Sequence, residues 1–217
     1  MKYIIMCGGS YPAFEKPRCL TEICGETLIE RTMRLLKETG VTDIAISSSD
    51  KRLGQYAPVL THKNEYEYEN GNATGNWFDC FYLTDEPVCY VFGDVFFSPQ
   101  AIRKIVSTET DGIELFGSKP PFSKYYPKRW IEPFALKVTD TEHLKRAIAK
   151  TKELDAMGKF WRKPIMWELW TVIKDVPLQT KPNKYIYNYT PINDYTCDVD
   201  SPQEVEKLDK HYRSILE

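Results

Sequence analysis

Short apolar runs that alternate with amphipathic helical segments constrain the fold of this chain more than any other feature. Residues 3–7, 43–47 and 88–92 are β-rich apolar runs, and a helical pattern over 26–39 separates the first two. Strands and helices in this alternation indicate βαβ crossovers. Parallel strands read as continuous apolar runs because both of their faces are covered. We therefore expect an α/β fold with a mostly parallel central sheet flanked by helices.

The rest of the chain supplies further elements of both kinds. We expect extended segments at 113–117, 131–138 and 185–189, and a short third strand within 55–60. We expect helices over 77–83, from Ser98 to about 107, from 140 or 141 to about 154, within a tryptophan-rich stretch over 161–173, and from Ser201-Pro202 onward. Residues 62–76 are expected to form a polar loop.

Composition and charge exclude several classes of protein. The 217 residues carry 29 basic and 31 acidic side chains, a formal net charge of −2. This balance gives no global attraction to nucleic acid or to a membrane, so any anionic ligand must be bound by a local arrangement. The six cysteines form no C-x-x-C pair, and no apolar run is long enough to span a bilayer. We expect a single-domain cytoplasmic protein with reduced thiols.

The segment after the first apolar run has features of a phosphate-binding loop. Gly8-Gly9 lets the backbone approach a ligand closely, and free N–H groups in such a loop can form an anion-binding nest. Lys16 and Arg18 add cationic charge a few residues later. Ligands of parallel sheets bind at the carboxyl ends of the strands, where this loop is expected to lie. The alternative is an ordinary glycine turn followed by a surface loop.

Carboxylates follow the apolar strands in two further places. Asp94 comes directly after the run 88–92 and Gly93, where it could hold a divalent cation or simply occupy a tight turn. Asp198 and Asp200 are two residues apart in an extended stretch, so their side chains point to the same side and could converge on one cation. The alternative for Asp200 is to cap the final helix.

Four segments, taken in order, resemble the nucleotidyltransferases. The family includes sugar-phosphate nucleotidylyltransferases, cytidylyltransferases and molybdenum cofactor guanylyltransferase-like enzymes. The resemblance covers about residues 1–108 and 190–217. The segments are Gly8-Gly9 with Lys16-Pro17-Arg18 and Ile23-x-Gly25-x-x-Leu28-Ile29-Glu30-Arg31, then Asn72-Ala73-Thr74-Gly75-Asn76, then Val91-Phe92-Gly93-Asp94, and last Val199-Asp200-Ser201-Pro202-Gln203-Glu204.

The resemblance implies a Rossmann-like, glycosyltransferase A-like fold and a Mg²⁺-dependent reaction. In that reaction an NMP group moves from an NTP to a small phosphorylated acceptor, and pyrophosphate leaves. The family pattern implies these roles: catalysis by Lys16 and Arg18; nucleotide binding by Gly8, Gly9, Ser10, Asn72, Thr74 and Gly75; metal binding by Asp94, Asp200 and Asp198. It also divides the single domain into an NTP-binding half (1–108), a variable acceptor region (109–190) and a closing metal-binding element with the C-terminal helix (191–217).

The chain departs from the family pattern in its glycine loop. The family's third glycine falls at Tyr11 and its arginine at Ala13, so one cation is missing from the pyrophosphate cradle. We hypothesise that Arg18, where the family usually has leucine, replaces it. A relative without that cation would be a non-catalytic nucleotide-binding protein. The other alternative is a glycosyltransferase that uses a nucleotide sugar, in which Asp198-Val199-Asp200 would be the metal-binding D-x-D motif.

Aromatic residues are concentrated in the variable region, where the family binds its acceptor. Trp167 and Trp170 are neighbours on one helix face, and such a stripe is more often core or subunit interface than a ligand cage. A homodimer through this region is one expectation. The functional alternative is an acceptor pocket, for which we expect Glu132, Trp130, Lys128 and Glu168. Small single-domain members of the resembled family often use CTP, so the resemblance favours CTP as the nucleotide.

Overall fold

The fold is built around a seven-stranded sheet. It is taken from a computed structural model that describes residues 1–8, 13–61, 67–69, 72–74, 77–119, 131–178 and 188–216. In spatial order the strands are β12 (Thr190–Ile192), β10 (Ile113–Ser118), β11 (Pro133–Val138), β8 (Val88–Phe92), β1 (Lys2–Met6), β4 (Ile44–Ser47) and β5 (Val59–Leu60).

The sheet is mostly parallel, as predicted. β8, β1, β4 and β5 pair in parallel, and so do β10 and β12, whereas β11 is antiparallel to both of its neighbours. Ile5 of β1, for example, lies between Val91 and Ile46. The carboxyl ends of β1, β4 and β8 therefore meet at one edge of the sheet, and that edge is where the candidate site is built.

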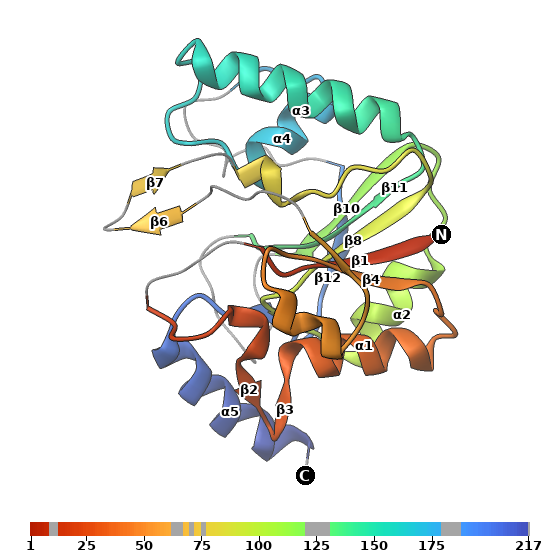
Figure 1. Cartoon of the computed structure of the whole chain (residues 1–217), viewed down its shortest axis with the longest axis vertical. Coiled ribbons are helices and arrows are strands. Elements are labelled where there is room, and N and C mark those ends of the chain that lie inside the picture. The colour runs from red at the N-terminus through yellow and green to blue at the C-terminus, as the bar shows by residue number, and fades with distance from the viewer. Residues whose placement is uncertain are drawn as a thin grey trace.

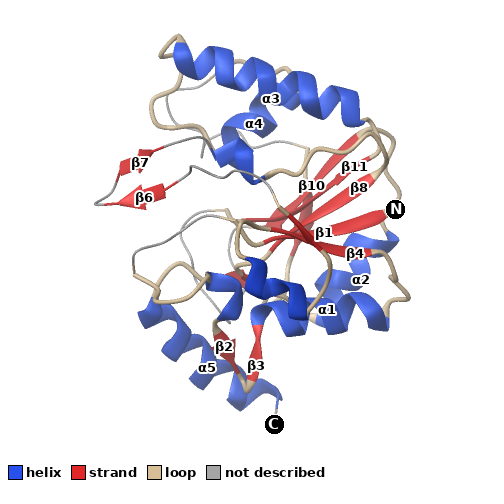
Figure 2. Ribbon diagram, in the orientation of Figure 1, coloured by secondary structure: helices blue, strands red, loops and turns tan. Residues whose placement is uncertain are grey.

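Helices cover both faces of the sheet. Figure 1 shows α1 (Leu28–Glu38) and α2 (Pro99–Ser107) on one side and α3 (Thr141–Ala156) and α4 (Met166–Ile173) on the other, and Figure 2 shows the same layers by element type. α5 (Pro202–Leu216) packs against the small hairpin of β2 (Glu22–Ile23) and β3 (Glu26–Thr27). Within the described part of the chain, every helix is too short or too polar to cross a bilayer.

Helix ends follow local capping rules. Thr27 Oγ1 accepts from the Glu30 N–H, and the Glu30 carboxylate accepts from the Thr27 N–H, which forms a capping box at the start of α1. Gly40 follows this helix at a φ of +86°, which glycine adopts without steric cost. Ser98 Oγ accepts from the Ala101 N–H and begins α2, whose first residue is Pro99.

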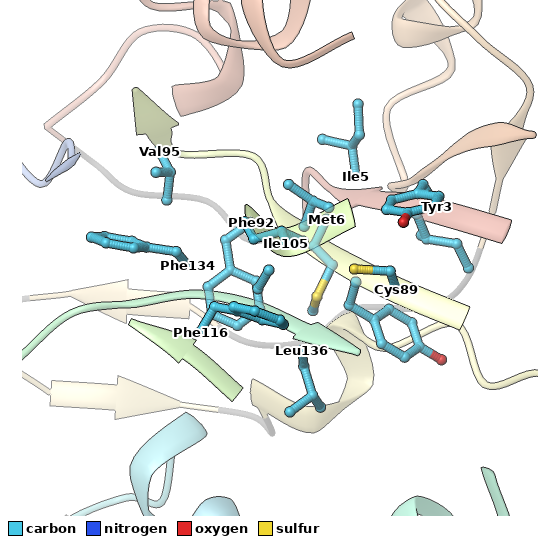
Figure 3. Packing of buried hydrophobic residues seen from close by; sticks show 14 of the residues in the cluster. Tyr3, Ile5, Met6, Cys89, Phe92, Val95, Ile105, Phe116, Phe134 and Leu136 are labelled. Atoms are coloured by element: carbon cyan, nitrogen blue, oxygen red, sulfur yellow. The ribbon is translucent and has the colours of Figure 1, made fainter. Parts of the chain in front are cut away.

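The hydrophobic core has two parts. The main cluster fills the space between the sheet and the helices, where Phe92, Phe116 and Phe134 pack with strand residues such as Met6 (Figure 3). The second cluster joins α5 to the strand pair β9 (Val95–Phe96) and β13 (Cys197–Asp198). In this cluster the rings of Phe96 and Tyr212 stack at 4.6 Å between centroids. The second cluster therefore fixes the closing segment of the chain against the end of β8.

Two local predictions were wrong, each for an identifiable reason. The predicted loop contains a hairpin of β6 (Glu67–Glu69) and β7 (Asn72–Thr74), and the sequence Asn70-Gly71 between these strands is a two-residue hairpin signal. The tryptophan-rich helix begins only at Met166, after Pro164. Most of the strand expected at 185–189 lies outside the described part of the chain, residues 188 and 189 are not in a strand, and β12 begins at Thr190.

Short 3₁₀ helices complete the fold. They are η1 (Arg18–Leu20), η2 (Lys51–Gln55) and η3 (Trp77–Cys80), and η3 occupies part of the helix predicted over 77–83. The helices predicted from Ser98 and from residues 140 to 154 are confirmed as α2 and α3, and the final helix is confirmed as α5.

Candidate active site

Asp94 is placed by the close approach of two strand ends. β8 ends at Phe92, and the Gly93 N–H donates to the Met6 carbonyl at 3.0 Å. A Cβ atom on Gly93 would lie only 2.7 Å from that carbonyl oxygen and 2.7 Å from Cys7 Sγ. Only glycine fits at this distance, so the glycine brings the ends of β8 and β1 together. Asp94 follows immediately and stands at the ligand-binding edge of the sheet.

The closing segment of the chain brings two more aspartates to Asp94. Asp198 pairs with Val95 in the β9–β13 ladder, and the Val199 N–H donates to the Asp94 carbonyl at 2.9 Å. Asp200 follows, and its N–H donates to the Glu204 carboxylate at 2.8 Å. Ser201 Oγ accepts from the N–H of Glu204, so the first turn of α5 has its own capping side chain. The closing segment therefore lies against the Asp94 backbone, and the convergence of Asp198 and Asp200 on one cation stays a prediction.

Glu132, the residue before β11, joins these aspartates. Carboxylate oxygens of Glu132, Asp198 and Asp200 all lie within 4.8 Å of one another, and we call these three residues the acidic cluster. Two backbone contacts fix Glu132 to the end of β10: its carbonyl accepts from the Ser118 N–H at 2.8 Å, and its N–H donates to Ser118 Oγ at 2.8 Å. The structure thus places a residue predicted for acceptor binding within the set predicted for metal.

Arg18 bridges the two parts of the site. Its Nη2 lies 2.7 Å from Asp94 Oδ2, and its Nη1 lies 3.3 Å from Asp200 Oδ1 and 3.4 Å from the Val199 carbonyl. The Arg18 side chain is 27% exposed. The guanidinium therefore lies between two carboxylates that the family pattern assigns to the metal.

The charge and chemistry of the site suit a divalent cation. The acidic cluster and Asp94 contribute four carboxylates against the single guanidinium of Arg18, a formal charge of −3 when all are ionised. Carboxylate oxygens are hard ligands of the kind that Mg²⁺ prefers, and Mg²⁺ needs only one or two of them in addition to phosphate and water. The residues present therefore fit the metal that the resemblance implies.

The other predicted site residues fall into two groups. Lys16 is exposed and precedes Arg18 by two residues, and Gly8 lies just beyond the end of β1. Asn72 and Thr74 are the ends of β7, where the structure describes the backbone. The remaining predicted residues lie outside the described part of the chain: Gly9, Ser10, Gly75, Lys128 and Trp130.

Glu168 is engaged in the structure of α4. Its carboxylate accepts from Arg162 Nε at 2.8 Å and from the Ile165 N–H at 2.9 Å, and the residue is buried. This contact begins the helix and neutralises the buried charge. We therefore leave Glu168 out of the site. Trp167 and Trp170 are buried in the main core, which confirms the core interpretation of the tryptophan stripe for these two residues.

The Cys7 thiol, next to Gly93, has a raised pKa. A hydrogen bond with Cys19 and burial raise the pKa of the Cys7 thiol well above its usual range. A protonated, buried thiol is a poor nucleophile and a poor metal ligand. Cys7 is therefore packing for the Gly93 backbone rather than part of the chemistry.

Sequence reasoning missed two features of the site. It did not place Glu132 with the aspartates, because residue 132 carries no motif and its position depends on the β10–β11 pairing. It also did not predict the double ion pair of Arg18. The only available signal was that an arginine stands where the resembled family has leucine.

Comparisons with known proteins identify the fold. No protein-family model and no curated protein matches the chain. Among solved structures, it is similar to a protein from Bacillus anthracis assigned as a glucose-1-phosphate thymidylyltransferase, with a TM-score of 0.59, 14% identity, and coverage of 98% of this chain and 95% of the other.

Two further solved structures extend this likeness. The inositol-1-phosphate CTP transferase of T. maritima has a TM-score of 0.57 at 15% identity and covers 98% and 96% of the two chains. The CTP:phosphocholine cytidylyltransferase of Streptococcus pneumoniae has a TM-score of 0.54 at 15% identity and covers 100% and 99%. The chain therefore has the Rossmann-like fold of the nucleotidyltransferases over its whole length.

Proposed function

We propose that this protein is a Mg²⁺-dependent nucleotidyltransferase that moves an NMP group from an NTP to a small phosphorylated acceptor. The observation that carries the proposal is the convergence of Asp94 with the acidic cluster at the ligand-binding edge of a nucleotidyltransferase fold. Segments from three distant parts of the chain supply these carboxylates, so their meeting is a property of the fold. Isolated surface carboxylates would not be held together against their mutual repulsion.

Asp94 and Asp200 are the residues that would hold Mg²⁺, with Asp198 and Glu132 beside them. When bound there, Mg²⁺ would supply positive charge that offsets the negative charge developing on the phosphate oxygens during transfer. The fold holds these carboxylates in fixed positions through backbone contacts. The β9–β13 ladder fixes Asp198, the bond from the Asp200 N–H to the Glu204 carboxylate fixes Asp200, and the Gly93 contact with β1 fixes Asp94.

Cationic and backbone groups after β1 would bind the triphosphate. Lys16 is an exposed point charge near the edge of the sheet, and lysine is a common phosphate ligand. By the family pattern, Gly8, Gly9 and Ser10 add backbone N–H groups. Asn72, Thr74 and Gly75 would contact the base and ribose.

The proposed reaction is an in-line displacement. An oxygen of the acceptor phosphate attacks the α-phosphorus of the NTP and forms a new P–O bond. The bond to the bridging oxygen of the β-phosphate breaks, and pyrophosphate leaves with that electron pair. Positioning and electrostatic stabilisation carry most of the catalysis in such a reaction.

The comparisons favour particular substrates. Two of the three named structures use CTP, and the names of all three contain a phosphorylated small molecule. We therefore propose CTP as the nucleotide and a small phosphate monoester as the acceptor. The acceptor would bind against residues 109–190, where Lys128 and Trp130 remain proposed contacts.

Pyrophosphate release tests the proposal. CTP, UTP, GTP and ATP are each incubated with Mg²⁺ and a panel of phosphorylated sugars, polyols and amino alcohols, and released pyrophosphate is measured. Turnover with one nucleotide and one acceptor is expected. Hydrolysis of a nucleotide sugar without pyrophosphate release would instead indicate a glycosyltransferase, and nucleotide binding without turnover would indicate a non-catalytic relative.

Matched carboxylate variants test the metal assignment. Asp94→Asn and Asp200→Asn each remove one negative charge at nearly constant shape, so Mg²⁺-dependent turnover should fall by about 100-fold or more. Asp43→Asn is the control, because Asp43 is an exposed carboxylate that pairs with Lys2 away from the site. Full turnover in Asp94→Asn would contradict the assignment.

A further inference from the structure

The double ion pair of Arg18 has a consequence for the order of binding. We propose that Arg18 is a built-in counter-ion of the metal site: Mg²⁺ must displace it from Asp94 and Asp200, so that metal binds weakly alone and tightly together with nucleotide. This inference rests on the metal site of the proposed function. It adds a role for Arg18, which stands where the resembled family usually has leucine.

The contacts show what Arg18 does in the metal-free protein. The two carboxylates belong to segments that are more than a hundred residues apart, one after β8 and one after β13. Arg18 reaches Asp94 Oδ2 at 2.7 Å and Asp200 Oδ1 at 3.3 Å with two different nitrogens of the same guanidinium. The planar fork of arginine suits such a bridge. The bridge offsets the repulsion between carboxylates that the fold brings together.

Metal and guanidinium compete for the same oxygens. A cation held by Asp94 and Asp200 uses the lone pairs that Arg18 now occupies, and two positive groups at one place repel each other. Binding of Mg²⁺ therefore includes the cost of breaking both Arg18 contacts. The four carboxylates make metal binding favourable, and Arg18 lowers its affinity.

Nucleotide offsets the cost of breaking the two Arg18 contacts. Once displaced, the guanidinium is a strong partner for phosphate oxygens, which it can bind through two N–H groups. A triphosphate therefore offers Arg18 a new anionic partner at the moment when the metal takes its old ones. Each ligand then improves the binding of the other, and linkage requires the effect to be reciprocal.

The backbone around Arg18 permits this exchange by a side-chain movement. Cys19, the next residue, is buried, and the Thr21 N–H donates to the Arg18 carbonyl at 2.9 Å. The main chain is therefore anchored at η1. The Arg18 side chain is 27% exposed, so rotation about its own bonds is enough to move the guanidinium away from the carboxylates.

Direct metal binding tests the proposal without turnover. Mn²⁺, which shares the oxygen ligands of Mg²⁺, is titrated into the full-length protein and free Mn²⁺ is measured by electron paramagnetic resonance. Arg18→Met should bind Mn²⁺ alone about tenfold more tightly than wild type, equivalent to about 1.4 kcal/mol. CTP should then increase Mn²⁺ affinity less in Arg18→Met than in wild type. Unchanged or weaker binding of Mn²⁺ by Arg18→Met would overturn the proposal.

Arg34→Met is the matched control. Arg34 also bridges two carboxylates, those of Glu26 in β3 and Glu38 at the end of α1, but its side chain is 45% exposed. Its substitution should leave Mn²⁺ affinity unchanged, and an equal gain in both variants would overturn the specific role of Arg18. The midpoint of thermal unfolding adds a second readout: metal-free Arg18→Met should unfold below wild type, and Mn²⁺ should raise its midpoint more than that of wild type.

Arg18→Lys covers the case in which Arg18→Met does not fold. Lysine keeps the charge but cannot form the two-pronged bridge, so tighter Mn²⁺ binding than wild type supports the proposal, and equal or weaker binding overturns it. The result is distinguishable from failure of the proposed function. Wild-type protein without pyrophosphate release in any combination refutes that function alone, whereas active wild type with unchanged Mn²⁺ affinity in the Arg18 variants refutes this inference alone.

Discussion

Replacement of Gly93 by alanine tests how the fold places the site. The added methyl group would lie 2.7 Å from the Met6 carbonyl oxygen and from Cys7 Sγ, and 3.3 Å from the Met6 carbonyl carbon. Real Cβ atoms essentially never approach within 3.0 Å of another atom, so something must move. One of the obstacles is backbone at the end of β1, which cannot turn aside as a flexible side chain does. The ends of β1 and β8 must therefore separate, and Asp94 moves with them.

Two opposing terms set the size of the effect. Overpacking in a buried region costs about 1–3 kcal/mol. Alanine also restricts the unfolded chain, which offsets about 0.4–1 kcal/mol of this cost at a position where φ is not positive. We therefore expect Gly93→Ala to lower the free energy of unfolding by about 1–2 kcal/mol, and the unfolding midpoint by about 2–4 °C for each kcal/mol in a domain of this size. Displacement of Asp94 should weaken Mn²⁺ binding by about tenfold or more.

Urea denaturation and Mn²⁺ titration measure the two effects on the same protein. Gly54→Ala is the matched control, because a Cβ there would meet only Val59 Cγ2, at an ordinary 3.9 Å. That variant should differ from wild type by less than about 0.5 kcal/mol. If Gly93→Ala were as stable as wild type and bound Mn²⁺ equally well, the close approach of the strand ends would not be what positions Asp94.

Two further predictions concern buried groups away from the metal site. Glu168→Gln removes the buried charge that accepts hydrogen bonds from Arg162 and the Ile165 N–H, so the free energy of unfolding measured by urea titration should fall by about 1–3 kcal/mol. Glu153→Gln is the control, because Glu153 forms an exposed ion pair, and it should change the same free energy by less than about 0.5 kcal/mol. Burial raises the pKa of the Cys89 thiol to about 12, above its value in the unfolded chain, so the folded state holds this proton more firmly and the free energy of unfolding should fall as pH rises above about 9. Cys89→Ala should reduce the steepness of that fall by up to about 1.4 kcal/mol per pH unit. An unaltered slope in this variant would contradict the burial argument.

The sheet was predictable because its signals are local. Each run of apolar residues that forms β1, β4 or β8 is buried on both faces, so the pattern alone marks it. α2 was equally clear, because Ser98 and Pro99 specify its start. The β12 strand was misplaced since its pairing with β10 is non-local. Parallel pairing between distant segments leaves little trace in either sequence.

The site was only partly predictable, for a related reason. Asp94 and Asp200 stand next to elements with strong local patterns, so their positions at the edge of the sheet could be inferred. Glu132 owes its place to backbone pairing with Ser118, across a stretch that carries no motif. The partners of Arg18 lie 76 and 182 positions away along the chain, and no residue pattern links them. Ion pairs of that kind appear only when the fold is known.

The distribution of charge explains why metal and arginine both belong to this site. The chain carries a formal charge of −2, and the four carboxylates with Arg18 carry −3, so the rest of the chain amounts to −2 − (−3) = +1. A triphosphate that approached these four carboxylates without a metal would be repelled by their like charge. A triphosphate that binds together with Mg²⁺ supplies the positive charge that offsets the carboxylates. Its phosphate oxygens also give Arg18 an anionic partner in place of Asp94 and Asp200. The carboxylates that repel free nucleotide thus favour the metal complex, and Arg18 holds Asp94 and Asp200 together until that complex binds.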